Sequence, residues 1–132
     1  MKYRIVTMNW ITRSFVRTHR DRIFLFGDNL TQRGFGGQAA AMRGEPNTVG
    51  IPTKKLPSNC EAAFFTDEDF EQNKEAIDPA FERLYRMSSP AEQIVVVPAD
   101  GLGTGRAQLG TRAPQTFAYL QKRLEDLSLQ LS

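Results

Sequence analysis

The stretch IFLFGDNLTQRGFGGQAAAMRG, residues 23–44, places an apolar run directly before a glycine-rich segment. A continuous apolar run closed by Gly27 is typical of a strand that is buried on both faces of a sheet. The residues from Gly27 to Gly37 predict a loop, and residues 38–43 are good helix formers that can stop at Gly44. The stretch therefore predicts a buried strand, a glycine loop and a helix in succession.

A second stretch near the end of the chain starts in the same way. Residues 94–97 read IVVV, and Pro98 ends this run before the segment PADGLGTGR, residues 98–106. All ten glycines lie either between Gly27 and Gly50 or between Gly101 and Gly110. If the two apolar strands are parallel, both glycine loops lie at one edge of the sheet, where α/β folds bind ligands. We therefore expect one binding cleft between the two loops, although the glycines can also mark simple turns.

The rest of the chain adds further strands and helices. Residues 3–8 and 49–51 predict strands, the second ended by Pro52, and residues 10–20 fit a helix or a strand equally well. Alternating strands and helices predict one α/β domain over residues 1–132. We expect a compact three-layer fold whose mixed, mostly parallel sheet is flanked by helices.

Two longer helices are expected in the second half. Residues 66–86 keep apolar residues on one face, and Thr66 with Asp69 resembles a capping box. Pro79 predicts a kink or two abutting helices. Thr111 is expected to cap a last helix whose apolar face extends to Leu131.

Composition excludes several classes of protein. With 132 residues, 40% hydrophobic and 24% charged, the chain matches an ordinary globular domain rather than a disordered tail, a collagen or a coiled coil. No apolar run is long enough to span a bilayer, and no signal peptide is recognised. The single cysteine, Cys60, cannot form an internal disulfide, and one cysteine with one histidine cannot form a Cys/His metal cage. We expect a cytoplasmic protein with no metal, no cofactor and no membrane partner.

Charge is distributed unevenly along the chain. Residues 1–55 hold ten Lys and Arg against three Asp and Glu, a balance of +7, whereas residues 56–93 hold three against nine, a balance of −6. The basic half contains the first glycine loop. It would attract an anionic partner such as a phosphorylated metabolite or a nucleic acid, unless the two halves neutralise each other across the folded surface.

The two loops supply the candidate ligand-binding residues. A glycine-rich approach to a helix presents backbone N–H groups to a phosphate, and Asp28 and Asn29 can bond a ribose or a base edge or form an Asx turn. Arg106 can hold a phosphate or lie in solvent. The candidates in the first loop are Gly27, Asp28, Asn29, Gly34, Gly36, Gly37 and Gln38, and those in the second are Gly101, Leu102, Gly103, Thr104, Gly105 and Arg106.

A lysine pair follows the short strand at residues 49–51. The segment GIPTKK, residues 50–55, brings Thr53 and Lys54 to the sheet edge. A lysine acts as a nucleophile only where burial or neighbouring cations lower its pKa, and an ordinary solvated cation is the simpler interpretation. Asp100 stands where a strand would deliver an acid to the same cleft.

These motifs, in this order, resemble the macrodomain, the ADP-ribose-binding fold. The shared features are a strand with Gly-Asp-Asn-Leu, a glycine loop opening an alanine-rich helix, a strand ending in Ile-Pro-Thr-Lys-Lys, and a strand leading into Pro-Ala-Asp-Gly-Leu-Gly-Thr-Gly. The resemblance covers roughly residues 22–125. It is nearest to the terminal ADP-ribose glycohydrolase class, which includes antitoxins that remove ADP-ribose from DNA.

The resemblance implies roles for individual residues. Lys54 matches the lysine that attacks the anomeric carbon of the ribose, and Asp28 with the first loop would hold adenine and phosphates. The second loop would wrap the diphosphate and the distal ribose. This chain has Gly105 and Arg106 where the class carries its acid, so Asp100 is the candidate acid.

Three functions therefore stay open at the level of sequence. The first is a macrodomain-like protein that binds ADP-ribose or a related nucleotide and hydrolyses an ADP-ribosyl bond on a protein or nucleic acid. The second is a reader or metabolite sensor that uses the same cleft without catalysis. The third is a nucleic-acid-binding protein that uses the basic first half.

Overall fold

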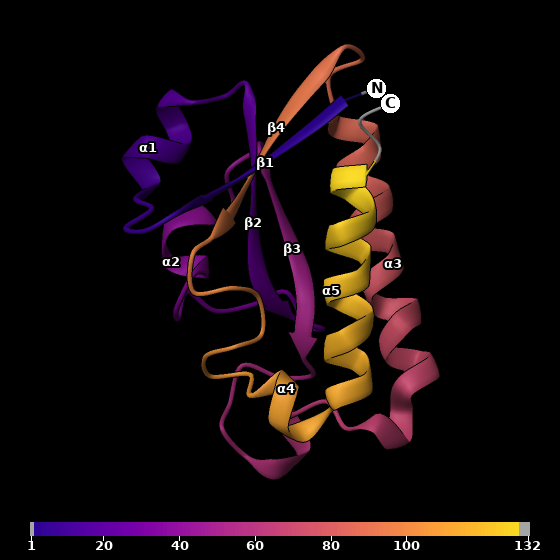
Figure 1. Cartoon of the computed structure of the whole chain (residues 1–132). Helices are drawn as coiled ribbons and strands as arrows, with labels where there is room; N and C mark the ends of the chain where they lie inside the picture. Colours follow the sequence, from indigo (N-terminus) through magenta and orange to yellow (C-terminus); the bar gives the residue numbers. More distant parts are fainter. Residues whose placement is uncertain (1, 130–132) are drawn as a thin grey trace.

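A computed structural model describes residues 2–129 of the chain (Figure 1). It contains four strands: β1 (Lys2–Met8), β2 (Arg22–Asn29), β3 (Thr48–Lys54) and β4 (Glu92–Pro98). The five helices are α1 (Arg13–Thr18), α2 (Ala39–Met42), α3 (Phe70–Met87), α4 (Leu109–Arg112) and α5 (Pro114–Leu129). Two short 3-10 turns, Glu61–Ala63 and Asp67–Asp69, precede α3.

The four strands form one sheet in the order β1-β4-β2-β3, and every neighbouring pair is parallel. The α/β class expected from the sequence is confirmed, and the sheet among the described residues is wholly parallel. The two apolar runs, in β2 and β4, are direct neighbours. Both glycine loops therefore leave the same edge of the sheet.

Period-2 alternation along the strands builds a core on each face. Phe24 and Phe26 of β2 pack with Val16 of α1 and with Ala39 and Met42 of α2. The alternate strand residues face α3 and α5, and this larger core contains Ile23, Leu25, Val49, Ile51, Ile77, Phe81, Leu84, Leu120 and Leu127. Figure 1 shows the resulting layers, with α1 and α2 on one side of the sheet and α3 and α5 on the other.

Several boundaries differ from the sequence-based expectation. The segment expected as a loop from Gly27 begins inside β2, which continues to Asn29, and β3 passes through Pro52 to Lys54. Pro52 is tolerated because β3 lies at the edge of the sheet, where a missing N–H is least costly. Residues 10–20 contain the short helix α1.

The expected helix caps are also wrong. Thr66 and Asp69 make no capping side-chain bond, and α3 begins at Phe70 and runs through Pro79 as one helix. Thr111 lies inside α4 rather than at the start of α5. The apolar face of α5 is confirmed at Leu120 and Leu127, whereas Leu131 lies outside the described residues.

Candidate functional site

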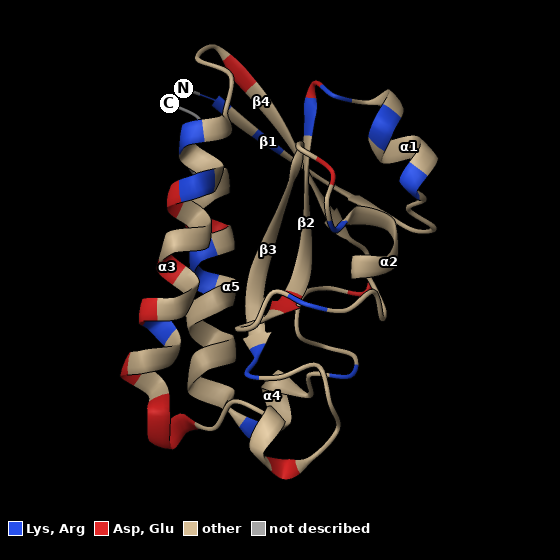
Figure 2. Ribbon diagram, turned by 180° about the vertical axis from the view of Figure 1, so that it is seen from behind, with Lys and Arg blue, Asp and Glu red and all other residues tan. Residues whose placement is uncertain are grey.

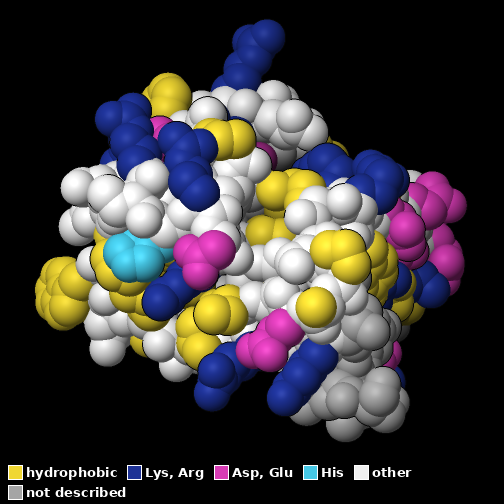
Figure 3. All heavy atoms as spheres, turned by 90° about the horizontal axis from the view of Figure 1, so that it is seen from above, with side chains coloured by type: hydrophobic (Ala, Val, Ile, Leu, Met, Phe, Trp, Pro, Cys, Tyr) yellow, Lys and Arg dark blue, Asp and Glu magenta, His cyan; other side chains and the backbone are white. Residues whose placement is uncertain are grey.

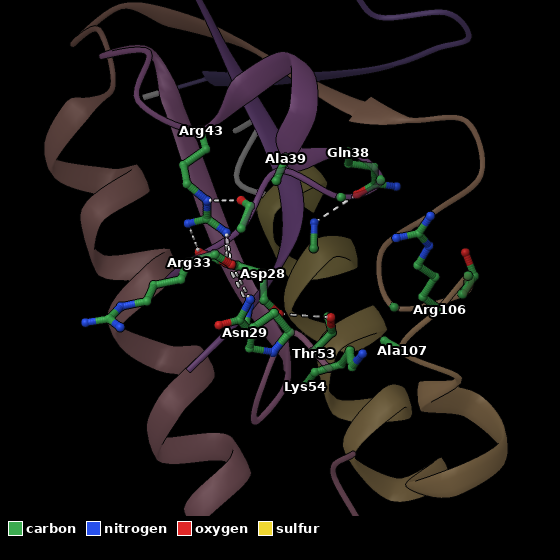
Figure 4. Close-up of a pocket in the computed structure, with 18 of the residues that line it drawn as sticks. Asp28, Asn29, Arg33, Gln38, Ala39, Arg43, Thr53, Lys54, Arg106 and Ala107 are labelled. Atoms are coloured by element: carbon green, nitrogen blue, oxygen red, sulfur yellow. Dashed lines mark hydrogen bonds and ion pairs between the residues drawn. The ribbon is translucent and has the colours of Figure 1, made fainter. Parts of the chain in front are cut away.

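A cavity of about 290 Å³ opens at the carboxyl ends of β2, β3 and β4. Its walls are the two glycine loops, and its floor includes Thr53 and Lys54 at the end of β3 (Figure 4). The candidate residues at this cavity are Gly27, Asp28, Asn29, Gly34, Gly36, Gly37, Gln38, Thr53, Lys54, Asp100, Gly103, Thr104, Gly105 and Arg106. Gly101 and Leu102 do not line it, because Leu102 is fully buried in the core beneath the loop.

Asp28 is buried at the end of β2 and already has a cationic partner. Arg43 Nη2 lies 2.5 Å from Oδ1, and Arg43 Nη1 lies 3.2 Å from Oδ2, a two-point pairing across the first loop (Figure 4). The side chain of Asp28 is only 6% exposed. Both oxygens are therefore engaged within the protein, and Asp28 shapes the cavity from below.

Asn29 and Thr53 also use their polar groups internally. The Asn29 carboxamide donates to the Arg33 carbonyl at 2.9 Å and accepts from the Thr31 amide at 3.0 Å, which is an Asx turn. Thr53 Oγ1 donates to the Asp28 carbonyl at 3.2 Å. Of the two interpretations of Asn29, the turn is the one the contacts support.

Gln38 joins the two glycine loops. Its Oε1 accepts from the Gly27 amide at 2.8 Å (Figure 4). Its Nε2 donates to the Gly101 carbonyl at 2.9 Å. A carboxamide is suited to this position because it offers one donor and one acceptor at its end. Gln38 therefore sets the spacing between β2 and the segment that follows β4.

One glycine of the second loop is required by its surroundings. Gly103 has φ of +78°, and an added Cβ would lie 3.0 Å from Leu109 and 3.2 Å from Thr53. A side chain there would be strained and would push into the core. An added Cβ on Gly105 would have no atom within 4 Å, so the space beside this glycine is open.

Lys54 is buried at the base of the cavity, and its ammonium group has few partners. Its Nζ donates to the Ser58 carbonyl at 2.7 Å and lies 4.9 Å from the centre of the Phe64 ring. Burial, followed by the charge of Arg106, lowers the pKa of Lys54 below its usual 10.5. No carboxylate among the described residues forms an ion pair with it.

Arg106 extends the positive charge of the cavity, and Arg33 lies at its edge. Arg106 reaches across its mouth, since an added Cβ on Gly36 would lie 2.8 Å from Arg106 Nη1. Arg33 lines the opposite wall, but its exposed side chain points away from Arg106 and Lys54 (Figure 4). Within the described part of the chain neither arginine forms an ion pair with an acid. The cavity therefore presents two cations that have no anionic partner, Lys54 and Arg106.

Asp100 is the one further acid at the cavity. It is exposed, and its backbone carbonyl accepts a hydrogen bond from the Thr104 hydroxyl across the second loop. No ion pair between Asp100 and Lys54 is formed. Among residues 2–129, no three His, Cys, Asp or Glu side chains are grouped so as to hold a metal ion.

Sequence analysis missed several residues of the cavity. The structure adds Arg33, Ala39, Arg43, Pro57 and Ala107 to its lining. Arg43 had a signal in the sequence, because an acid at the end of a buried strand requires a partner and Arg43 closes the helix that follows. Pro57 and Ala107 have no chemical signal of their own.

The fold and the cavity define an α/β protein whose parallel sheet carries an open, positively charged site at its carboxyl edge. The chain belongs to the Family of unknown function (DUF7831), whose model matches residues 6–123. No curated protein and no solved structure matches the chain. None of the described helices is long and apolar enough to cross a membrane.

Proposed function

We propose that this protein binds ADP-ribose or a related nucleotide in the cavity between the two glycine loops. The observation that carries the proposal is the meeting of Lys54 and Arg106, neither of them paired with an acid, in a cavity of about 290 Å³. Small-molecule sites occupy about 300–1,000 Å³ at such sheet edges, so the cavity lies near the lower end of that range. A nucleoside diphosphate derivative is an anion of the matching charge.

The chemistry of the lining supports a diphosphate in particular. Arg106 offers a planar, always charged fork to phosphate oxygens, and Lys54 adds a second cation from the floor. The glycines at positions 36, 37, 103 and 105 allow a ligand to approach the backbone closely. Asp28 is neutralised by Arg43, so it does not repel the anion.

Hydrolysis of an ADP-ribosyl bond is a second candidate, favoured by the lowered pKa of Lys54. In this reaction the neutral amine attacks the anomeric carbon, and the bond to the leaving group breaks as that group takes a proton from an acid. Water then attacks the same carbon, releases ADP-ribose and restores the free amine. Asp100 is the acid at the cavity that is free of an ion pair, and it would have to approach the leaving group from the exposed side.

Binding without catalysis is supported by what surrounds Lys54. Its Nζ is held by the Ser58 carbonyl rather than by a carboxylate that could take up its proton. The partner in this case is the nucleotide itself or an ADP-ribosylated protein or nucleic acid. We also propose a cytoplasmic location, because a reducing compartment suits the single exposed thiol of Cys60.

Nucleic-acid binding through the basic first half has less support. Arg13 and Arg17 of α1 turn inward to Glu45, at 2.6 and 3.1 Å, so part of the basic excess is neutralised. Figure 2 shows acidic residues along α3 and the turn before it, on the opposite side of the sheet from α1. On the face drawn in Figure 3, Lys and Arg side chains are dispersed among apolar and acidic ones.

Calorimetric titration separates these functions. The protein is titrated with ADP-ribose, with AMP and with a short DNA duplex at two salt concentrations. We expect saturable heat with ADP-ribose. Absence of that heat, together with DNA binding that weakens steeply with salt, would overturn the proposal in favour of a nucleic-acid-binding protein.

The catalytic candidate is tested with Lys54→Ala and Lys54→Arg. Release of ADP-ribose from an ADP-ribosylated peptide or oligonucleotide is measured beside ADP-ribose affinity. Hydrolysis through Lys54 predicts that both variants lose release while Lys54→Arg retains binding. Equal release by the wild type and the variants excludes Lys54 from the reaction.

A further inference from the structure

A second cavity of about 320 Å³ lies beside the first, at the carboxyl ends of β1 and β4. Gly37, Gln38 and Asp100 line both cavities. The two spaces are therefore neighbours on either side of the Gln38 bridge, and one extended ligand can occupy both. Figure 1 shows the end of β4 reaching α2, which forms a wall of this second space.

The second cavity differs from the first in its chemistry. Its lining is about equally apolar, as at Met8 and Met42, and polar, as at Asn9, and the charged side chain at its edge is Asp100. None of the lysines and arginines described in the structure lines it. A space that holds an acid and no cation disfavours a phosphate and suits a neutral group with an apolar face and polar edges.

Trp10 lines this cavity with an exposed side chain and a left-handed backbone conformation. Its side chain is 94% exposed, although tryptophan is a large apolar residue. Its backbone has φ of 56°, in the left-handed region that a bulky residue adopts at a cost. The indole contributes almost nothing to the core, so its face is free to stack on a planar ring.

The first cavity leaves no place for a base at Asp28. The resemblance to macrodomains implies that this acid holds adenine, but both of its oxygens accept hydrogen bonds from Arg43. A base that approached Asp28 would have to break this pairing. The space beside Trp10 lies at the same edge of the sheet and lacks this pairing.

We infer that the second cavity is a subsite for a planar, neutral aromatic ring, the base of the nucleotide whose diphosphate lies in the first cavity. This inference rests on the proposed function. The ligand passes Gln38 from the cationic cavity to the second cavity, and its ring stacks on Trp10. Stacking of a base on an aromatic side chain contributes strongly to binding, so Trp10 is a major determinant of affinity.

The inference is tested with ADP and with inorganic pyrophosphate, which carries the anion without the base. Trp10 is the single tryptophan of the chain, so its fluorescence reports the subsite directly. We expect ADP to quench this fluorescence saturably and pyrophosphate to bind in calorimetry without quenching it. Trp10→Ala should weaken ADP binding roughly tenfold or more and leave pyrophosphate affinity unchanged, and Trp10→Phe should recover part of the loss.

Phe35→Ala is the matched control. Phe35 is an aromatic residue of the first loop, 64% exposed, that lines neither cavity, so its removal should change neither affinity. If pyrophosphate and ADP bind equally to wild type and to Trp10→Ala, the subsite is wrong while the diphosphate site stands. If neither probe binds the wild type, the proposed function fails and the inference fails with it.

Discussion

The pairing of Asp28 with Arg43 is the residue-scale feature on which the site depends. The acid ends β2, its partner follows α2, and the guanidinium also donates from Nε to the Gly34 carbonyl at 2.6 Å. One arginine thus neutralises a buried charge and holds the first glycine loop in place. The contact joins residues 15 positions apart, so the sequence indicates that Asp28 needs a partner, but no spacing rule assigns Arg43 to it.

Replacement of Arg43 should therefore be costly. Arg43→Met leaves the buried Asp28 carboxylate without its partner, and we expect a loss of about 3 kcal/mol in the free energy of unfolding. Urea denaturation of Arg43→Met, Asp28→Asn and the double variant measures the coupling. The double variant should lose less than the sum of the two single losses, and strict additivity would contradict a direct pairing.

Lys54 gives a second prediction at this scale. Because the charge of Arg106 helps to lower the pKa of Lys54, Arg106→Gln should raise that pKa toward 10.5. The control Arg86→Gln changes an exposed arginine of α3 that does not line the cavity and should leave the pKa unchanged. Titration of ¹³C-labelled lysine by NMR measures the pKa of Lys54 in both variants. Equal pKa values in the two variants would show that the charge of Arg106 does not lower the pKa of Lys54.

At the scale of elements, the start of α5 is stabilised from a distance. Asp67 accepts from the Gln115 and Thr116 amides at 2.9 and 3.1 Å, so it satisfies N–H groups at the helix start that have no partner within the helix. The sequence predicted a capping box in this turn, from Thr66 and Asp69, and assigned it to the start of α3. Asp67 and Gln115 are 48 residues apart, so no local spacing in the sequence predicts this cap.

Asp67→Ala should therefore destabilise the protein by about 1 kcal/mol, as loss of an N-cap does. Glu68→Ala, at the neighbouring exposed position, should change stability by less than about 0.5 kcal/mol. Thermal and urea unfolding compare the two variants. Equal losses would indicate a general effect of acids in this turn rather than a cap on α5.

Glu45 links α1 to the segment between α2 and β3. The hydrogen bond from Arg13, helped by Arg17, holds the pKa of Glu45 below its usual 4.5. Because this pKa is lowered in the folded state, the stability that the ion contributes is complete above pH 4.5 and is lost as pH falls through the folded value.

Glu45→Gln should therefore lower the melting temperature at pH 7, and the gap to the wild type should close in the acid range below pH 4.5. Melting curves between neutral and strongly acid pH measure this gap. A gap that stays constant across the whole range would show that the charge of Glu45 is not what stabilises α1.

At the scale of the whole molecule, the sequence predicted that both glycine loops lie at one edge of the sheet, but it did not predict the side-chain contacts between them. The apolar runs at residues 23–26 and 94–97 are local patterns that indicate strands buried on both faces of a sheet. Such strands are typical of parallel sheets, and the parallel pairing of β2 with β4 brings both loops to one edge. The Gln38 bridge spans 63 residues to Gly101, and the cavity beside Trp10 draws on β1, α2 and β4 together. Such contacts exist only after folding, so sequence periodicity is silent about them.

The central claim is that the two glycine loops form one nucleotide-binding cavity, and NMR titration of ¹⁵N-labelled protein with ADP-ribose tests it most directly. Glycine amides report each wall separately. The account predicts saturable shifts at Gly36, Gly37, Gly103 and Gly105, with little change at Gly44 and Gly110, which do not line the cavity. No saturable shift at either loop, or shifts confined to residues outside the cavity, would contradict it.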